Sequence, residues 1–432
     1  MFNMKIYNYA TLTKKEIKAL SERSYLMPEK LKQAVWETGL QVMKRGDKAI
    51  KELTAAFDGV TLSSLKVSVK EFKQAEKLVS NELKDAIKTA SENIAKFHKS
   101  QLKTKEPVIE TSKGIECWRE FKALGTAGLY VPGGSAPLFS TVLMLAVPAK
   151  IAGCKKVYIC TPPCKNGLIA PEILFAAKTA GVDEVYKIGG AQAVFAMAYG
   201  TQTVPKADKI FGPGNQYVTQ AKMEVSSFTA IDMPAGPSEV LIIAEESTNA
   251  SYAAADILSQ AEHGPDSQAV LACSSKNKIK EIIAEVDAQL KKLGRKSIAA
   301  KALGKSFIMQ TRNTKESVEF SNIYAPEHLI LNFKDWKKYL TSVQNAGSVF
   351  CGTLATESFG DYASGTNHTL PTSGFAKSFG GLNTQSFGKW ITYQTVSAQG
   401  LRGLGKTVEI MAEAEGLTAH KNAVTIRIEN EK

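Results

Sequence analysis

The sequence predicts an α/β fold in which helices cover parallel sheets. From about residue 107 onward, short apolar runs bounded by glycine or proline alternate with stretches of helical periodicity, which is typical of βαβ units. Between about residues 13 and 97, apolar residues recur at spacings of three and four, which indicates amphipathic helices. We therefore expect a helical N-terminal region followed by doubly wound parallel sheets, two in number.

The individual elements follow from the same patterns in chain order. The N-terminal helical pattern is interrupted at Gly59 and again at residues 65–69. Helices are expected at residues 171–179 and 250–261, among others. After Gly380 the chain turns glycine-rich and then helical. Strands are predicted at residues 126–131, 156–160, 184–188, 209–211, 240–243, 269–272, 328–331 and 347–350, with a helix at about 406–417 and a final strand-like segment at 423–427.

Composition narrows the classes of partner. The chain has 432 residues, 44% of them hydrophobic, which is enough for two or three packed domains. Its net charge is +12, but lysines and arginines never run more than two in a row, whereas a surface that tracks phosphates clusters its cations. We therefore expect no nucleic-acid partner and assign the excess charge to solvated helix faces and to attraction for small anionic cofactors.

Apolar stretches and cysteines indicate where in the cell the protein is expected. The most apolar stretch, residues 141–147, is far shorter than the roughly 20 residues that a membrane-spanning helix needs. The first residues lack the apolar core of a secretory signal. Six cysteines are too few for a disulfide scaffold in so long a chain, so we expect reduced thiols, no membrane segment and a cytoplasmic protein.

Histidines mark the candidate site. Four of the five lie in the last 170 positions, each in a segment crowded with carboxylates, amides or glycines. Imidazole both ligates borderline metals and moves protons near neutral pH, so these clusters indicate one composite metal and acid–base site. The four are His263, His328, His368 and His420, whereas His98 looks incidental.

Gln260 and His263 are three apart at the end of a predicted helix, so both side chains can face one point and supply two ligands to zinc. Taken alone, His263 could equally cap the helix before Gly264 and Pro265. Asp361 could be a turn residue and His420 a surface residue. Together, however, these four residues supply two nitrogens and two oxygens with one negative charge.

Glu327 and His328 follow Pro326, and adjacent side chains reach one substrate only by flanking it. This arrangement suits two distinct proton-transfer roles. The alternative is that Glu327 caps a turn while His328 enters a half-buried strand. His368 lies in a loop too polar to belong to a core, and such loops often carry function.

Three glycine-rich loops follow predicted strands, at residues 130–134, 189–192 and 212–215. Each could let backbone amides approach a pyrophosphate at a helix N-terminus. None has the GxGxxG pattern, so a dinucleotide site is plausible but not established by these loops alone.

Taken together, these segments resemble the histidinol dehydrogenase family almost from end to end. The most specific matches are residues 232–239 (DMPAGPSE), 258–268 (LSQAEHGPDSQ), 325–328 (APEH) and 360–368 (GDYASGTNH). The resemblance implies two related, incomplete Rossmann-like domains with parallel sheets, a helical N-terminal arm, a small C-terminal tail domain and an intertwined homodimer. The expected boundaries are 1–24 for the arm, 25–129 with 237–381 for the domain carrying the metal and catalytic groups, 130–236 for the NAD-binding domain, and 382–432 for the tail.

The resemblance also implies an activity: oxidation of L-histidinol to L-histidine through a held aldehyde, with two NAD⁺ reduced, in the final steps of histidine biosynthesis. Glu327 would activate the water that hydrates the aldehyde, and His328 would accept the alcohol proton. One Zn²⁺ per subunit would be bound by Gln260, His263, Asp361 and His420. Substrate contacts carry over to Ser238, His328, His368 and Glu415 besides the metal ligands, and NAD contacts to Tyr130, Gln192 and Asn215.

The implied homodimer allows His420 to reach the partner subunit's site. Two rival functions stay open at this point. A zinc hydrolase would explain the metal cluster but would leave the three glycine loops without a role. A silent NAD-binding module would need one proton-transfer group to be missing, and both are present.

Overall fold

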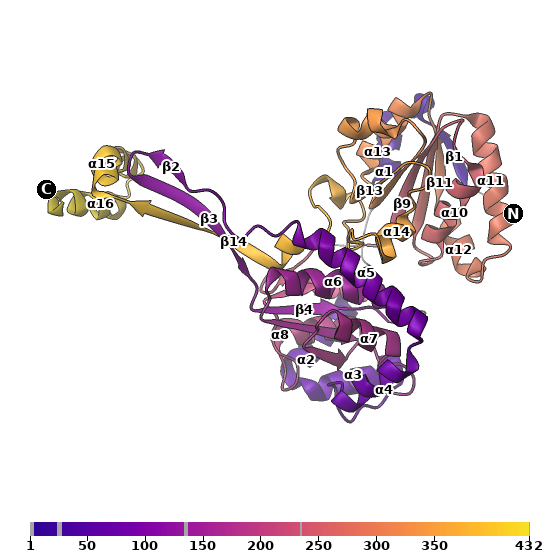
Figure 1. The fold of residues 1–432 in the computed structure, drawn as a ribbon, viewed down its shortest axis with the longest axis horizontal. Helices are drawn as coiled ribbons and strands as arrows, with labels where there is room; N and C mark the ends of the chain where they lie inside the picture. The colour runs from indigo at the N-terminus through magenta and orange to yellow at the C-terminus, as the bar shows by residue number, and fades with distance from the viewer. Residues whose placement is uncertain (1–3, 24–27, 134–136, 234–235, 432) are drawn as a thin grey trace.

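The computed structural model describes residues 4–23, 28–133, 137–233 and 236–431, so Gly134, Pro234 and Ala235 of the quoted motifs lie outside the described residues. It confirms an α/β fold with two parallel sheets (Figure 1). All eight predicted strands are present to within two residues at their ends. A third, antiparallel sheet extends from the body as an arm.

The first sheet has six strands in the order β1-β11-β10-β9-β12-β13, all parallel. Residues of β9 alternate between two cores, as the two-residue period of a strand requires. Val240 and Ile242 face one core and Leu241 and Ile243 the other, and all four are fully buried. The strands are β1 (Lys5–Asn8), β9 (Glu239–Ala244), β10 (Gln268–Cys273), β11 (Phe307–Gln310), β12 (His328–Asn332) and β13 (Ser348–Cys351).

Helices cover both faces of this sheet. One core includes apolar residues of α10, α11 and α12, and the other includes residues of α1 and α13. The helices of this lobe are α1 (Lys14–Ser21), α10 (Ala250–Ala261), α11 (Lys276–Leu290), α12 (Lys296–Leu303), α13 (Thr314–Tyr324) and the short α14 (Glu357–Tyr362), with 3₁₀ turns η1 (Tyr9–Thr11), η2 (Trp336–Ser342) and η3 (Phe375–Lys377). We call this unit the first lobe.

The second lobe contains the five-stranded parallel sheet, in the order β6-β5-β4-β7-β8. Its strands are β4 (Thr126–Tyr130), β5 (Lys156–Thr161), β6 (Glu184–Lys187), β7 (Lys209–Phe211) and β8 (Ala230–Ile231). Its helices are α2 (Glu29–Arg45), α3 (Asp47–Asp58), α4 (Val69–Leu78), α5 (Asn81–Lys99), α6 (Phe139–Ala152), α7 (Pro171–Thr179), α8 (Gly190–Tyr199) and α9 (Gln216–Val225), with the turn η4 (Thr384–Phe387).

The predicted grouping of residues 25–129 with 237–381 does not match the packing. Val35 and Val42 of α2 join the core under α8, and Ile87 and Ile94 of α5 join the core around α6, so these helices cover the five-stranded sheet. Strand β4 also belongs to that sheet. Periodicity shows that a helix has an apolar face, but it does not show which sheet the face covers.

The N-terminal arm, predicted as helical, is also different. Residues Lys5–Asn8 form β1, which pairs in parallel with Phe307–Gln310 at the edge of the first sheet. With four residues and mostly exposed side chains, β1 carries little strand signal of its own. Its partner strand, about 300 positions away, supplies the pairing.

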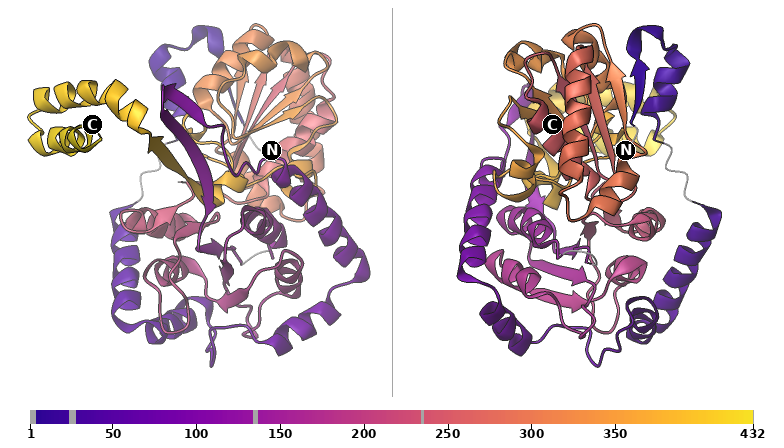
Figure 2. Two further views of the ribbon diagram at one scale, coloured as in Figure 1. Left: turned by 60° about the vertical axis from the view of Figure 1, so that its left-hand side comes forward. Right: turned by 90° about the vertical axis from the view of Figure 1, so that its right-hand side faces the viewer.

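The C-terminal tail and two strands from residues 109–123 together form an arm. Strand β14 (Gly388–Val396) pairs antiparallel with β3 (Ile115–Ala123), which also pairs with β2 (Ile109–Ser112). Helices α15 (Ala398–Ala414) and α16 (Thr418–Asn430) lie at its far end, away from both lobes (Figures 1 and 2).

The strand predicted at 423–427 is wrong, because this segment is part of α16. Val424 and Ile428 are four apart and pack against the face of α15 at Gly405, where a Cβ atom would lie 2.7 Å from Ile428. Helix packing therefore overrides the β-branched composition of the segment.

In the described part of the chain, no helix is long and apolar enough to cross a membrane, and all six cysteines are free thiols.

Candidate active site

The candidate catalytic residues gather at the amino-terminal edge of the six-stranded sheet. His328 is the first residue of β12, and Glu239 is the first residue of the neighbouring β9. Helix α10 returns toward this edge and ends at Ala261, so Gln260 lies in its last turn and His263 just beyond it. The helix begins with an Asn249 cap, whose Oδ1 accepts the Ser251 amide at 3.0 Å.

Glu327 and His328 are both buried, with 5% of each residue exposed. Glu327 Oε2 lies 3.6 Å from His328 Nδ1 and accepts the backbone amide of Glu239 at 2.9 Å. His328 Nδ1 lies 3.2 Å from the Glu239 carbonyl, and His328 Nε2 lies 3.6 Å from Asp361 Oδ1. A carbonyl oxygen can only accept, so Nδ1 carries the hydrogen in the neutral ring and the lone pair of Nε2 is free.

The electrostatics of this pair follow from burial and from close charges. Burial raises the pKa of Glu327 to about 8, because the charged carboxylate loses its hydration. Burial alone would lower the pKa of His328, but the carboxylates of Glu327, Asp361 and Glu357 outweigh it and raise that pKa above its ordinary value. The pKa of Glu327 is therefore displaced toward neutral pH, where a carboxyl group can exchange its proton, whereas the pKa of His328 is displaced upward to about 10.

Gln260 is completely buried, and neither its amide oxygen nor its amide nitrogen has a hydrogen-bond partner within the protein. Buried polar atoms without partners are rare in proteins, and they often mark a position where an ion or a ligand binds. His328 Nε2 is buried and unpartnered in the same way. These atoms are therefore suited to contact a bound group.

The predicted metal ligands come together only in part. His263 Nε2 lies 3.9 Å from Asp361 Oδ2, and the Ser259 hydroxyl, next to Gln260, donates to Glu357 on α14 at 2.7 Å. Helices α10 and α14 thus lie side by side. Within the described ranges, however, no three histidine, cysteine, aspartate or glutamate side chains converge closely enough to hold a metal ion.

His420 and Glu415 are not at this site within the single chain. Both are exposed and lie at the end of the arm, where Glu415 caps α15 and His420 is the third residue of α16. Figure 1 shows this end of the arm far from α10 and α14. The fourth predicted ligand must therefore meet the other three by another route if they share an ion.

His368 connects the two lobes. Its Nδ1 lies 3.0 Å from the Asp361 carbonyl, and its Nε2 lies 3.3 Å from the Thr141 hydroxyl at the start of α6. Ser238 is half-buried beside Glu239, and its carbonyl accepts the Gln268 amide at 3.1 Å. The amino edge of the first sheet therefore faces the N-terminus of a helix of the second lobe.

The predicted cofactor residues lie at the opposite, carboxyl-terminal edge of the five-stranded sheet. Tyr130 ends β4, and its hydroxyl accepts the Gly190 amide at 3.1 Å. Gln192 is buried in the first turn of α8, next to that glycine. Asn215 is exposed and caps α9, with its Oδ1 accepting the amides of Tyr217 and Val218.

Gly212 is held close to Tyr130. Its φ is +117°, and an added Cβ atom would lie 2.1 Å from the Tyr130 carbonyl oxygen. The Lys222 ammonium donates to the Gly212 carbonyl at 2.9 Å and pairs with Asp232 at 2.5 Å, and Asp232 accepts the Gly212 amide at 2.8 Å. A buried ion pair thus fixes this loop in a conformation that only glycine adopts easily.

Several contacts at the site were not predicted from the sequence. Thr141 lies in the most apolar stretch of the chain, where nothing marks its hydroxyl as a partner for His368. Glu357 is 1% exposed, and its Oε2 has no partner. Its one signal is the spacing of four between Glu357 and Asp361, which places both on one face of a helix.

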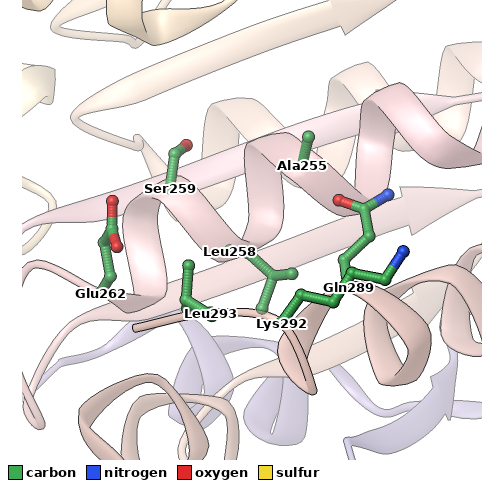
Figure 3. Close-up of a pocket in the computed structure, with 7 residues that line it drawn as sticks. All are labelled: Ala255, Leu258, Ser259, Glu262, Gln289, Lys292 and Leu293. Atoms are coloured by element: carbon green, nitrogen blue, oxygen red, sulfur yellow. The ribbon is translucent and has the colours of Figure 1, made fainter. Parts of the chain in front are cut away.

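A shallow pocket lies beside the site helix, between α10 and α11 (Figure 3). It is lined by Ala255, Leu258, Ser259, Glu262, Gln289, Lys292 and Leu293. None of the predicted site residues lines this pocket. It is therefore separate from the Glu327–His328 pair.

Known proteins that are similar to this chain share one family description. The family model described as histidinol dehydrogenase matches residues 21–428. The chain is 52% identical to a histidinol dehydrogenase of Bacteroides thetaiotaomicron over 98% of this chain and 99% of that protein, and 49% identical to a chloroplastic one of Oryza sativa subsp. japonica over 99% and 90%. A crystal structure of histidinol dehydrogenase from Elizabethkingia anophelis superposes with a TM-score of 0.96 at 48% identity, covering 100% of this chain and 99% of that one. The chain therefore belongs to the histidinol dehydrogenase family.

Proposed function

We propose that this chain is an oxidoreductase that converts L-histidinol to L-histidine with two NAD⁺ and one zinc ion per subunit. The buried Glu327–His328 pair beside Asp361 is the observation that carries the proposal. The reaction consumes one water and yields one histidine, two NADH and three protons. It supplies the last steps of histidine biosynthesis.

The first oxidation requires removal of the alcohol proton, and His328 Nε2 is the acceptor. Because Nδ1–H donates to the Glu239 carbonyl, the ring presents the lone pair of Nε2 toward Asp361 and the unpartnered atoms of the site. A bound NAD⁺ would supply the acceptor for the hydride that leaves the alcohol carbon. Tyr130, Gln192 and Asn215 are the residues proposed to hold it, at an edge where helix N-termini favour a pyrophosphate.

The second oxidation requires a hydrated aldehyde, and Glu327 is the base that activates the water. One of its oxygens is held by the Glu239 amide, so the carboxylate has a fixed orientation. Its raised pKa makes it a stronger base than an ordinary carboxylate. Neighbouring proton acceptors for two successive steps explain why the two residues are adjacent.

Gln260, His263, Asp361 and His420 would suit zinc, because histidine nitrogens and a carboxylate oxygen are its usual ligands and the Gln260 amide oxygen has no other partner. Bound there, zinc would orient the substrate through its imidazole and amine without changing oxidation state. Ser238, His368 and Glu415 would complete the substrate contacts. Holding the substrate at a point away from the reacting carbon keeps it in place between the two oxidations.

We further propose a homodimer in which the arm delivers His420 and Glu415 to the partner subunit. The arm exposes apolar side chains, including Val396, Ile410 and Met411, which are 49%, 56% and 60% exposed. Exposed apolar surface of this kind is typical of protein interfaces. A partner's arm would supply the ligand that the single chain leaves far away.

Absorbance of the reduced nicotinamide tests the function directly. Purified protein with zinc, histidinol and NAD⁺ is expected to form two NADH per histidinol. No NADH would instead support a zinc hydrolase or a silent module. One NADH per histidinol would mean that the reaction stops at the aldehyde.

A further inference from the structure

Arg23, which lies in the N-terminal segment, reaches the back of the Glu327–His328 pair. Its side chain is 13% exposed, and its Cζ atom lies 3.7 Å from the centroid of the Tyr324 ring. Its guanidinium donates to the carbonyls of Ser21 at 2.8 Å, Tyr324 at 2.9 Å and Ala325 at 3.3 Å. Nothing in the proposed reaction uses this arginine.

The same guanidinium binds both oxygens of Glu239. Nη2 donates a hydrogen bond to Oε1 at 2.7 Å, and Nε lies 2.6 Å from Oε2 as an ion-pair contact. The Ser373 amide also donates to Oε1 at 3.1 Å. The Glu239 side chain is 4% exposed, so Arg23 is the positive charge that balances a buried negative one.

The backbone of Glu239 holds both proton-transfer residues. Its amide donates to Glu327 Oε2, and its carbonyl receives the Nδ1 hydrogen of His328. A shift of this one residue would therefore move the carboxylate and would change the tautomer that leaves Nε2 free.

Arg23 also supports the turn that leads into the pair. Ala325 has a φ of +53°, a left-handed conformation that is unusual for a residue other than glycine. Such strain persists only where surrounding contacts hold it. The arginine donates hydrogen bonds to the carbonyls of the peptide units before and after Ala325, immediately before Pro326 and Glu327.

We infer that Arg23 and Glu239 are positioning residues for the proposed reaction: Arg23 fixes Glu239 and the 324–325 turn, and through them it sets the orientation of Glu327 and His328. This inference rests on the proposed function, and it assigns a task to the N-terminal segment. The segment contributes a charged side chain that joins β9 to the turn before β12.

The test compares Arg23→Met, Arg23→Lys, Glu239→Gln and the double variant Arg23→Met/Glu239→Gln in the full-length, zinc-loaded protein. Initial rates are measured with histidinol and, separately, with the aldehyde, and are expressed per zinc-loaded subunit. We expect Arg23→Met to lower kcat on the aldehyde by roughly 100-fold, because small displacements of a catalytic group have effects of this size, with KM changed less than about threefold. Arg23→Lys keeps the positive charge, so its kcat on the aldehyde should fall less than that of Arg23→Met.

Glu239→Gln and the double variant distinguish two possible causes of a lower rate. One is the loss of positioning of Glu327 and His328, and the other is a general loss of stability of the protein. Without Arg23, Glu239 is a buried charge without a partner, so removing that charge too should make the double variant no worse than Arg23→Met alone. Arg45→Met is the matched control, because Arg45 makes a 2.7 Å ion pair with Glu52 on an exposed surface. It should leave both rates within twofold of the original.

Each outcome decides the inference. If Arg23→Met folds and keeps its kcat, or changes KM alone, the positioning role is overturned. If Arg23→Met does not fold, Arg23→Lys and Glu239→Gln carry the same kcat comparison, and normal kcat in both overturns the role. An inactive unsubstituted protein would refute the proposed function instead.

Discussion

The two parallel sheets of this protein differ in the edge that carries the proposed functional residues. One sheet carries the proposed cofactor residues at its carboxyl edge, and the other carries the proton-transfer residues at its amino edge. The proposed cofactor residues lie beyond the carboxyl ends of β4, β6 and β7, where ligands of doubly wound sheets usually bind. The proton-transfer residues and the end of α10 lie instead at the amino edge of the six-stranded sheet. Two parallel sheets, both covered by helices, therefore carry different kinds of proposed functional residue at opposite edges.

Helix direction explains this division. At the carboxyl edge of a parallel sheet the following helices begin, so α6, α8 and α9 direct their N-termini there and favour an anion. At the amino edge the helices end, and α10 and α13 direct their C-termini toward Gln260 and Glu327. A cation is favoured at such an edge, which suits the proposed zinc ion.

The largest expected effect tests the amino edge. Glu327→Gln keeps the shape of the side chain but removes the base, so oxidation of the aldehyde to the acid should slow by about 10² to 10⁴-fold. The alcohol-to-aldehyde step should slow much less, because His328 accepts that proton. Rapid-mixing measurements with each substrate give the two rates. Equal slowing of both would contradict the water-activating role.

A second experiment asks whether the amino edge is complete in one subunit. His263→Asn and His420→Asn should each abolish activity, because each would remove a proposed zinc ligand. If the arm serves the partner, mixing the two variants after subunit exchange should restore about a quarter of the activity, since half of the dimers are mixed and each has one intact site. No recovery after verified exchange would place His420 in its own subunit's site, and an active His420→Asn variant would place it outside the site.

A third experiment tests the carboxyl edge. Gly212→Ala adds a Cβ atom 2.1 Å from the Tyr130 carbonyl at a φ of +117°, so the loop must move. We expect the dissociation constant of NAD⁺, measured by calorimetry, to rise about tenfold while zinc content stays unchanged. Gly294→Ala is the control, because nothing lies within 4 Å of its added Cβ. Unchanged NAD⁺ affinity in Gly212→Ala would argue against this edge as the cofactor site.

The smallest expected effect concerns the junction between the lobes. His98 is fully buried, with Nδ1 2.9 Å from the Ile94 carbonyl and Nε2 3.3 Å from Asn367 Nδ2. Burial lowers the pKa of His98 below its ordinary 6.5, so the unfolded chain takes up a proton there that the folded chain refuses. The neutral, buried His98 therefore contributes to the free energy of unfolding. This contribution is complete above pH 6.5 and declines as the pH falls from 6.5 toward the lower pKa of the folded state.

In His98→Gln this decline should disappear, which reduces the pH slope of stability by at most about 1.4 kcal/mol per pH unit. Urea unfolding at pH 7.5, 6.5 and 5.5 measures the slope. The variant will also be less stable at every pH, because it loses buried hydrogen bonds. An unchanged slope would mean that His98 titrates normally.

The sequence allowed eight strands of the parallel sheets and their parallel arrangement to be predicted, because apolar runs between glycines and prolines are local signals, but it did not allow β1, β8 or β11 to be predicted. It also indicated Glu327, His328 and Asp361, and the structure places a carboxylate oxygen of Glu327 and one of Asp361 each 3.6 Å from a ring nitrogen of His328. It did not indicate Arg23, which meets Tyr324 across 301 positions. Nor did it show that α2 to α5 cover the second sheet, since an amphipathic helix does not encode which sheet it covers.

The position of β1 has a consequence for synthesis of the protein on the ribosome. Residues 5–8 leave the ribosome about 300 residues before their partners at 307–310. At translation rates of 5 to 20 residues per second, this delay is roughly 15 to 60 s. During that time all five strands of the second sheet, at residues 126–231, are already synthesised, whereas residues 5–8 have no strand to pair with.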